Sequence, residues 1–491
     1  MLTDRGGVRK DATSGFIWSL MERICSQGVA TIISIILARI LDPSHYGIIA
    51  IVAIFTSFCT TFVNSGFGTA LIQKKDADEL DFNSAFTFNL IVSFVLYLIL
   101  FILAPTIASF YEIDRLTALL RVMGLSLPIS ALSAIQHAYM QKELEFKRYF
   151  SSTLISTLLS GAVGIGAALG GLGVWALALQ SLIKPAVDSV VLIIIVRWKP
   201  RLRMSYSRIK TLIPFGSRVL ITTFIMNLES EIRSLIIGKQ YSATDLAFYN
   251  NGAIYPKLIF MNIGNSITRV MLPLFSSIQD DEKKFRNVLS RSIKVSTYAI
   301  MPLLAGLIAV AKPMVIALYT DKWIASVPFI QIICLAYFTQ SYENSCKEAL
   351  LATGRSGLVM RNMFITKIVS LVSILIAVYY FRNIYAIAWS GVLWTIISVA
   401  LYANQISKFF QYSVSKQLFD VLPAILLSVL MGCAVYTVPY WLHLSSGLIL
   451  IVQILLGAII YIGTSWIFKV ESFVYLLSYV KDYKEKIRAK L

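Results

Sequence analysis

Ionisable side chains inside apolar stretches are the residues of this 491-residue sequence that could do chemistry. Each such charge costs at least about 2.5–3.5 kcal/mol at the centre of a bilayer, so deep charges are expected to face a shared polar interior. Eight cations and five acids have these positions. They are Arg23, Arg121, Lys184, Arg218, Arg233, Lys257, Arg269 and Lys367, with Glu22, Asp188, Glu229, Glu231 and Glu343.

Structural explanations compete with a functional one for some of these charges. Lys184 and Asp188 are four residues apart, as are Glu229 and Arg233, so each pair shares a helix face and could neutralise itself. Four other cations lie within about two turns of a predicted helix end, where a long stem can carry the charge to water. These are Arg121, Arg218, Arg269 and Lys367. The sequence leaves these alternatives open.

A polar, water-filled interior between the helices would allow the deeper cations to bind a substrate. Pro185 and Pro256 adjoin Lys184 and Lys257, and a proline frees backbone carbonyls that can line a polar path. Arginine binds phosphate oxygens with two parallel bonds and lysine supplies a mobile charge, while nearby hydroxyl and amide groups suit sugars. The pattern favours an interior that binds an anionic, sugar-bearing molecule.

Five cations are the predicted substrate-binding residues, and four acids are candidates for coupling to a proton or sodium gradient. A carboxylate in a low-dielectric interior responds both to desolvation and to a cationic neighbour, so binding of an anion nearby could change its affinity for an ion. The cations are Arg23, Lys184, Arg233, Lys257 and Arg269, and the acids are Glu22, Glu229, Glu231 and Glu343. No pattern indicates a catalytic centre, a metal site or another cofactor.

Fourteen apolar stretches must position these residues. A spanning helix needs about 20 apolar residues at about 1.5 Å per residue. The fold class predicted is therefore an all-α polytopic membrane protein with fourteen transmembrane helices. The predicted spans are 14–40, 44–72, 83–108, 116–140, 150–171, 174–197, 211–238, 244–275, 290–311, 325–350, 358–380, 384–406, 417–439 and 444–468.

The charges between the spans predict the orientation. With both termini in the cytoplasm, the inner segments hold thirty lysines and arginines and the outer segments hold six. Short basic loops stay on the inner side of a membrane, so both ends are expected to be cytoplasmic. The first apolar stretch has no small-residue cleavage site, which favours a retained helix. The predicted location is the bacterial plasma membrane.

Composition excludes several other classes. A mean hydropathy of +0.73 with 57% hydrophobic residues rules out an ordinary soluble domain. The net charge of +18 arises mainly from inner loops that meet anionic lipid headgroups, so nucleic acid is not an expected partner. The five cysteines lie inside apolar spans without metal-ligand spacing, and we expect buried thiols without disulfides.

A basic segment near the middle divides the chain. Residues 197–210 carry six cations and no acid, and residues 36–47 can be laid over residues 236–247 at an offset of 200. This indicates a parallel duplication of a six-helix unit. The predicted organisation is a first six-helix lobe over 1–200, a second, pseudo-symmetric lobe over 201–410, two further transmembrane helices over 411–468, and a cytoplasmic amphipathic tail over 469–491.

Eight short segments resemble the multidrug/oligosaccharidyl-lipid/polysaccharide exporter superfamily, and within it the Wzx-type polysaccharide flippases. The resemblance covers nearly the whole length and depends on the order and spacing of the segments. They are Leu37-Ala-Arg-Ile-Leu-Asp-Pro-Ser-His-Tyr-Gly47, Gly66-Phe-Gly-Thr-Ala-Leu-Ile-Gln73, Leu144-Glu-Phe-Lys147, Gly171-Leu-Gly-Val-Trp-Ala-Leu177, Arg197-Trp-Lys-Pro200, Leu235-Ile-Ile-Gly238, Leu318-Tyr-Thr-Asp-Lys-Trp323 and Ala352-Thr-Gly-Arg355.

This resemblance implies two six-helix lobes around a central cavity lined by the first, second, seventh and eighth helices, and alternating access. It implies a cargo of polyprenyl-diphosphate-linked oligosaccharide moved from the inner to the outer leaflet for exopolysaccharide, capsule or O-antigen biosynthesis. Membrane lipids and polysaccharide assembly proteins are the other implied partners, and a monomer is expected. Relatives often carry an acid just before the Gly66 motif, where this chain has Asn64, and an aspartate on the seventh helix, where this chain has Glu229 and Glu231.

Two alternatives remain at this stage. A drug or organic-cation exporter of the same superfamily is disfavoured by the excess of cations over acids in the spans. A membrane polysaccharide polymerase or glycosyltransferase generally needs a large outer segment with acids or arginines, and no predicted outer segment exceeds roughly fifteen residues. The chain has no Gly-x-x-x-x-Gly-Lys-Ser/Thr motif, so we expect no ATP hydrolysis and no enzymatic activity.

Overall fold

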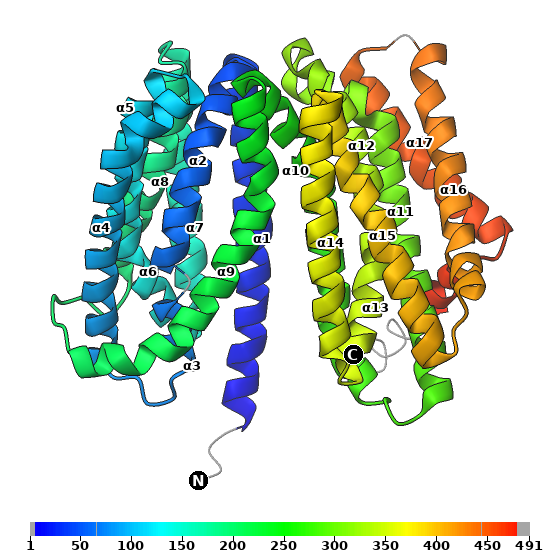
Figure 1. The fold of residues 1–491 in the computed structure, drawn as a ribbon, viewed down its shortest axis with the longest axis horizontal. Helices are drawn as coiled ribbons and strands as arrows, with labels where there is room; N and C mark the ends of the chain where they lie inside the picture. The colour runs from blue at the N-terminus through cyan, green and yellow to red at the C-terminus, as the bar shows by residue number, and fades with distance from the viewer. Residues whose placement is uncertain (1–4, 65, 443, 479–491) are drawn as a thin grey trace. The chain divides into compact units, whose positions relative to one another are not determined.

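The computed structural model describes residues 5–64, 66–442 and 444–478, and this part of the chain is almost entirely helical, without a strand. The first helices are α1 (Arg5–Ile40), α2 (Pro43–Asn64), α3 (Phe67–Gln73), α4 (Glu79–Tyr111), α5 (Arg115–Gly124), α6 (Ser126–Lys142), α7 (Phe146–Leu169), α8 (Val174–Ile195) and α9 (Tyr206–Gln240). Figure 1 shows their arrangement.

The remaining helices include one 3₁₀ and one π segment. They are α10 (Ala243–Ser276), α11 (Glu282–Tyr319), η1 (Asp321–Ser326), α12 (Val327–Tyr337), α13 (Gln340–Ala352), α14 (Ser356–Ile376), η2 (Ala377–Phe381), α15 (Ile384–Phe410), α16 (Val414–Trp441) and α17 (Ser446–Ile467). Residues 471–478 are also helical, and the rest of the predicted amphipathic tail lies outside the described residues.

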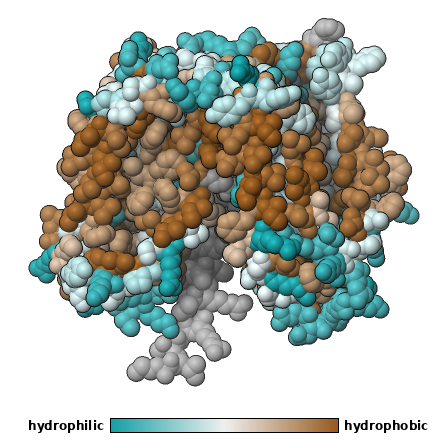
Figure 2. Space-filling model, in the orientation of Figure 1, coloured by the Kyte–Doolittle hydropathy of each residue, from teal (hydrophilic) through white to brown (hydrophobic). Residues whose placement is uncertain are grey.

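The helices have the length and composition of membrane spans. Within the described residues, thirteen helical segments are long and apolar enough to cross a bilayer, and some of them join consecutive helices, as Arg115–Lys142 joins α5 and α6. The predicted first span falls on α1, where Ile24–Ile40 forms a shorter apolar helix. On the visible face of each unit, apolar residues cover the middle of the helices and polar residues gather at their ends (Figure 2). An all-helical, multi-pass membrane protein is thus confirmed, and the count of fourteen stays a prediction.

The chain forms two compact units, Met1–Ala247 and Phe248–Leu491, which we call unit 1 and unit 2. In unit 1, α9 contains Pro214 and packs against α2, α3 and α4. Figure 1 shows α9 running along one end of this unit before it rises beside α2. In unit 2, α11 packs against α12, α13, α16 and α17. The division into lobes after residue 200, which rests on sequence duplication, stays a prediction.

A small-residue stripe on α7 permits close packing in unit 1. A β-carbon added at Gly161 would lie 2.1 Å from Ile33 Cδ1 on α1, and one at Gly164 would lie 3.0 Å from the Gln180 β-carbon on α8. At Gly166, by contrast, nothing lies within 4 Å. Gly161 and Gly164 therefore set the distance between helices, as small residues do in membrane bundles.

Gly161→Ala is expected to lower the free energy of unfolding by about 1–3 kcal/mol, because the new methyl group overlaps the Ile33 side chain, which must leave its packed position. Gly166→Ala is the matched control on the same helix. It should be neutral or stabilising by up to about 1 kcal/mol through helix propensity. Thermal unfolding in detergent micelles measures both changes. Equal transition temperatures for the two variants would contradict the packing described here.

Candidate functional site

A polar cavity of about 680 Å³ lies within unit 1. It is lined by residues from α2, α3, α5, α6, α7 and α8. Nine of the 22 lining residues are serines or threonines, which is unusual for helices that otherwise face lipid. They are Thr56, Thr60, Thr69, Ser126, Ser130, Ser133, Thr153, Ser156 and Ser181.

Helical periodicity brings these side chains to one interior. Residues three or four apart lie on the same face of a helix. The lining residues follow this spacing on four helices: Thr56, Thr60 and Asn64 on α2; Ser126, Ser130, Ser133, His137 and Gln141 on α6; Tyr149, Thr153 and Ser156 on α7; and Ser181, Lys184 and Asp188 on α8. Four polar stripes thus meet inside the unit.

His137 and Asp188 form an ion-pair contact across the cavity wall. His137 Nε2 on α6 lies 2.7 Å from Asp188 Oδ2 on α8, and Ser152 Oγ donates a hydrogen bond to Asp188 Oδ1. The pairing of Asp188 with Lys184 considered from the sequence is therefore wrong, because the neighbouring helix α6 supplies the partner. Lys184 has an exposed side chain that lines the cavity, and within the described residues it makes no ion pair.

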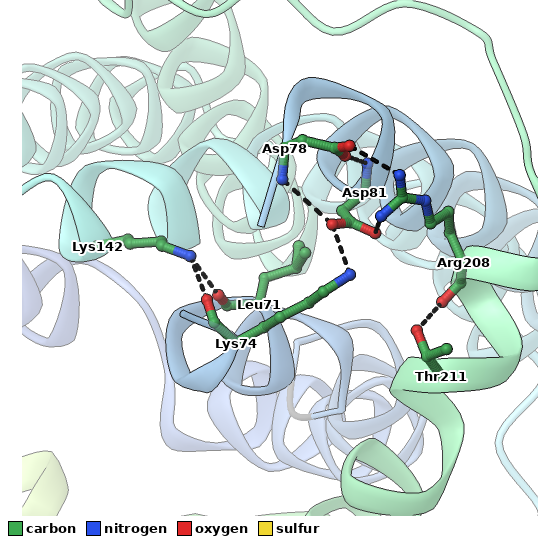
Figure 3. A network of polar contacts seen from close by, with 7 residues as sticks. All are labelled: Leu71, Lys74, Asp78, Asp81, Lys142, Arg208 and Thr211. Atoms are coloured by element: carbon green, nitrogen blue, oxygen red, sulfur yellow. Dashed lines mark hydrogen bonds and ion pairs between the residues drawn. The ribbon is translucent and has the colours of Figure 1, made fainter. Parts of the chain in front are cut away.

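A charge network fixes the helix ends beside this cavity (Figure 3). Lys74 Nζ lies 2.6 Å from Asp81 Oδ2, and Arg208 Nη2 on α9 lies 2.9 Å from Asp78 Oδ2. Asp78 and Asp81 also form a capping box that starts α4. Lys142 Nζ, at the end of α6, donates to the carbonyl oxygens of Leu71 and Lys74 at 3.1 and 2.5 Å. The network ties α3, a cavity wall, to three other helices.

The two acids of this network differ in exposure. Asp81 has a fully buried side chain, whereas the Asp78 side chain is 48% exposed. The backbone amide of Asp81 donates to the Asp78 carboxylate, and this bond together with the charge of Arg208 lowers the pKa of Asp78. Asp81 is thus the buried centre of the network and Asp78 its exposed edge.

Asp81→Asn is expected to lower the free energy of unfolding by up to about 3 kcal/mol, because it removes the acid shared by Lys74 and Arg208. The loss stays below that of a fully buried pair because both cations are partly exposed. Asp78→Asn is the control and should cost less, since asparagine also caps helices well. The transition temperature in detergent checks the order, and a larger drop for Asp78→Asn would contradict it.

Of the predicted substrate-binding residues, Lys184 lines the cavity. Arg233 is half-buried on α9, and Lys257 and Arg269 have exposed side chains on α10. None of these three lines the unit 1 cavity. Arg23 is on α1, but its side chain lies outside the described part of the structure. The assignment of these cations to the substrate stays a prediction.

The predicted coupling acids are also spread over several helices. Glu231 is half-buried on α9, and the side chains of Glu22 and Glu229 lie outside the described part of the structure. Glu343, on α13 in unit 2, accepts hydrogen bonds from Thr339 Oγ1 at 3.0 Å and from Ser398 Oγ at 2.6 Å. No group of three or more His, Cys, Asp or Glu that could hold a metal occurs among the described residues.

The sequence interpretation missed His137 and the hydroxyl stripes. His137 is a single imidazole among apolar residues, and its partner Asp188 is 51 positions further along the chain. The available signal was the recurrence of Ser and Thr at helical spacing on α2, α6 and α7. That recurrence indicates a polar interior only when several helices are compared.

The fold and the cavity together define a multi-pass membrane protein with a polar interior. Residues 36–328, more than half of the chain, match the family described as polysaccharide biosynthesis protein, and the chain belongs to that family. Among its relatives are the lipopolysaccharide biosynthesis protein WzxC of Escherichia coli, 24% identical over 71% of both chains, and the teichuronic acid biosynthesis protein TuaB of Bacillus subtilis, 23% identical over 72% of this chain and 73% of TuaB.

Solved structures have the same fold. The lipid II flippase MurJ in an inward closed conformation has a TM-score of 0.71 at 16% identity, with 92% of this chain and 98% of MurJ covered. An inward-facing multidrug resistance MATE family transporter of the MOP superfamily has a TM-score of 0.59 at 13% identity, with 80% and 98% covered. The resemblance expected from the short segments is confirmed by the family match and by the relative WzxC, and the solved structures of MurJ and the MATE transporter share the fold.

Proposed function

We propose that this protein is a flippase that moves polyprenyl-diphosphate-linked oligosaccharide from the inner to the outer leaflet for surface polysaccharide biosynthesis. The observation that carries the proposal is membership of the polysaccharide biosynthesis family combined with a fold shared with a lipid II flippase. The relatives WzxC, TuaB and the succinoglycan biosynthesis transport protein ExoT of Rhizobium meliloti support it by their names.

Physical chemistry explains why such a cargo needs a protein. Burial of an unpaired ion in hydrocarbon costs tens of kcal/mol by the Born estimate, and each unpaired sugar hydroxyl adds to the cost. A polar interior removes this barrier for the diphosphate and the sugars, while the polyprenyl chain remains in the lipid. The cavity in unit 1 supports the proposal because it provides hydroxyl groups and a lysine within a lipid-facing bundle.

We assign the binding of the diphosphate to Arg23, Arg233 and Lys257. Lys184 and Arg269 are the two further cations proposed to bind the cargo. Arginine can hold two phosphate oxygens at once, whereas lysine acts as a point charge. Replacement of the arginines should therefore be more damaging than their exchange for lysine. This assignment rests on the depth of these residues in apolar segments.

Inward movement of protons or sodium ions is the proposed energy source. The candidate residues are Glu22, Glu229, Glu231 and Glu343. Glu343 supports this idea best, because its carboxylate is held by two hydroxyl groups in the interior of unit 2. If binding of the ion at Glu343 changes the affinity of the protein for its cargo, binding of the cargo must change the affinity for the ion by the same factor. The ion gradient can then drive transport of the cargo.

Both termini are proposed to be cytoplasmic in a bundle of fourteen spanning helices. In a cysteine-free background, a single cysteine at Ser205 should react with an impermeant thiol reagent only from the inside, and one at Ser445 only from the outside. The charge asymmetry between inner and outer segments is the physical reason. Labelling of both positions from one side would contradict the fourteen-helix topology.

Deletion of the gene in its host tests the function. Surface polysaccharide should be lost, while the lipid-linked repeat unit accumulates on the cytoplasmic side of the membrane. Loss of polysaccharide without accumulation would point to an enzyme that makes the repeat unit. Unchanged polysaccharide with altered resistance to organic cations would favour a drug exporter.

A further inference from the structure

We propose that the cavity inside unit 1 binds the saccharide of the cargo and that Lys184 pairs with an acidic group of that saccharide. This inference rests on the proposed function and adds the substrate chemistry of one particular cavity. The cavity lies wholly within unit 1, between α2, α3, α5, α6, α7 and α8. Its lining does not include Arg233 on α9, which is assigned to the diphosphate.

The hydroxyl groups of the wall have hydrogen-bonding capacity left for a ligand. Several donate their hydrogen to a carbonyl of their own helix, as Thr56 does to Val52, Ser156 to Thr153 and Ser181 to Leu177. A hydroxyl that donates in this way keeps oxygen lone pairs that accept hydrogen bonds. The wall therefore offers a dense set of acceptors, which matches the hydroxyl donors of a saccharide.

Hydrogen-bond donors and an aromatic ring also line the cavity. The amides of Asn64 and Gln141 and the ammonium group of Lys184 supply hydrogen-bond donors, and Tyr149 contributes an aromatic ring. Only seven of the 22 lining residues are alanine, glycine, proline, isoleucine or methionine. A hydrophobic drug would leave most of these polar groups unpaired, and each unpaired polar group lowers affinity.

The charges of the cavity favour an anionic saccharide. Asp188 is occupied by His137 and Ser152, and Lys184 projects into the cavity without an ion pair among the described residues. If His137 is neutral, Asp188 and Lys184 balance, and if His137 is protonated one positive charge remains. In both states the cavity has no excess negative charge, so the ammonium group can bind a carboxylate or a similar acidic substituent.

Size and position agree with loading from the cytoplasm. A volume of about 680 Å³ falls within the range of about 300–1,000 Å³ that holds drug-sized ligands, which is the size of a short oligosaccharide. The lining residues Asn64, Ile72 and Gln141 lie at helix ends that continue into the basic segments with Lys74 and Lys142. The cavity thus approaches the side of the membrane on which the proposed cargo is made.

Protection of a cavity cysteine by the cargo tests this inference. In a cysteine-free protein that still supports surface polysaccharide, single cysteines replace Ser130, which lines the cavity, or Ser151, a half-buried serine on α7 that does not. The probe is the host's own lipid-linked pool. Inside-out membranes are prepared from three strains. The first strain makes no lipid-linked sugar, the second attaches only the first sugar to the diphosphate, and the third makes the complete repeat unit.

The complete repeat unit should slow thiol labelling of Ser130→Cys several-fold and leave Ser151→Cys unchanged. Lys184→Gln in the Ser130→Cys protein should reduce this protection when the repeat unit is acidic. Equal labelling of Ser130→Cys in all three strains would overturn the inference, and the proposed function would stand if the cysteine-free parent protein supports surface polysaccharide in the same host. Full protection by the first sugar alone would assign the cavity to the diphosphate end and also overturn it.

Discussion

Lys184→Glu is expected to abolish surface polysaccharide without lowering the amount of protein in the membrane. The substitution replaces an attraction for an acidic saccharide by a repulsion, and it adds a second carboxylate one turn from Asp188. Two unit charges about 4 Å apart interact by about 4 kcal/mol at an effective dielectric constant of about 20. A change of this size corresponds to a loss of more than about a hundredfold in affinity.

Conservative variants separate charge from structure at this position. Lys184→Arg keeps the charge and should retain most of the export, and Lys184→Gln should be intermediate. The readouts are surface polysaccharide per cell and the membrane level of the protein by immunoblot. Normal export by the glutamate variant would show that the Lys184 ammonium group does not meet the cargo.

Glu343→Gln is expected to remove the response of transport to an imposed proton or sodium gradient. Glutamine has the same shape: its carbonyl oxygen can accept the hydrogen bond of one hydroxyl, from Ser398 or Thr339, and its amide NH2 group can donate to the oxygen of the other. It cannot release a proton or supply a charged ligand for sodium. The variant should therefore exchange cargo passively at a rate that no gradient changes.

Glu348→Gln is the matched control for this prediction. Glu348 lies on the same helix, α13, and is buried, with 6% of its surface exposed, whereas Glu343 is half-buried. Transport by the two variants is compared in proteoliposomes with and without each gradient. If Glu343→Gln responds to the gradients as the unchanged protein does, Glu343 does not couple the ion.

Apolar length predicted most of the helices, because a lipid environment requires about 20 apolar residues for a span. The predicted span 83–108 lies within α4, and 150–171 largely coincides with α7. Breaks inside a span were not predicted. The stretch 116–140 divides into α5 and α6 near Leu125, and 325–350 divides into α12 and α13. Such breaks depend on packing between helices, which hydropathy does not contain.

The site was only partly predictable for the same reason. Lys184 was recognised because a cation inside an apolar segment is costly. The partner of Asp188 was not recognised, because helix spacing identifies neighbours along one helix, whereas His137 reaches Asp188 from α6. The cavity itself depends on how six helices pack, and no single stripe of serines and threonines reveals it.

The most direct test of the proposed function is reconstitution of the purified protein into liposomes that contain its host's lipid-linked oligosaccharide. The fraction of oligosaccharide that an external, impermeant sugar-modifying enzyme can reach should rise with time in proportion to the protein content. Liposomes that contain the Lys184→Glu variant should resemble protein-free liposomes. The assignment as a flippase would be contradicted if the unchanged protein exposed the oligosaccharide no faster than protein-free liposomes do, both with and without proton and sodium gradients.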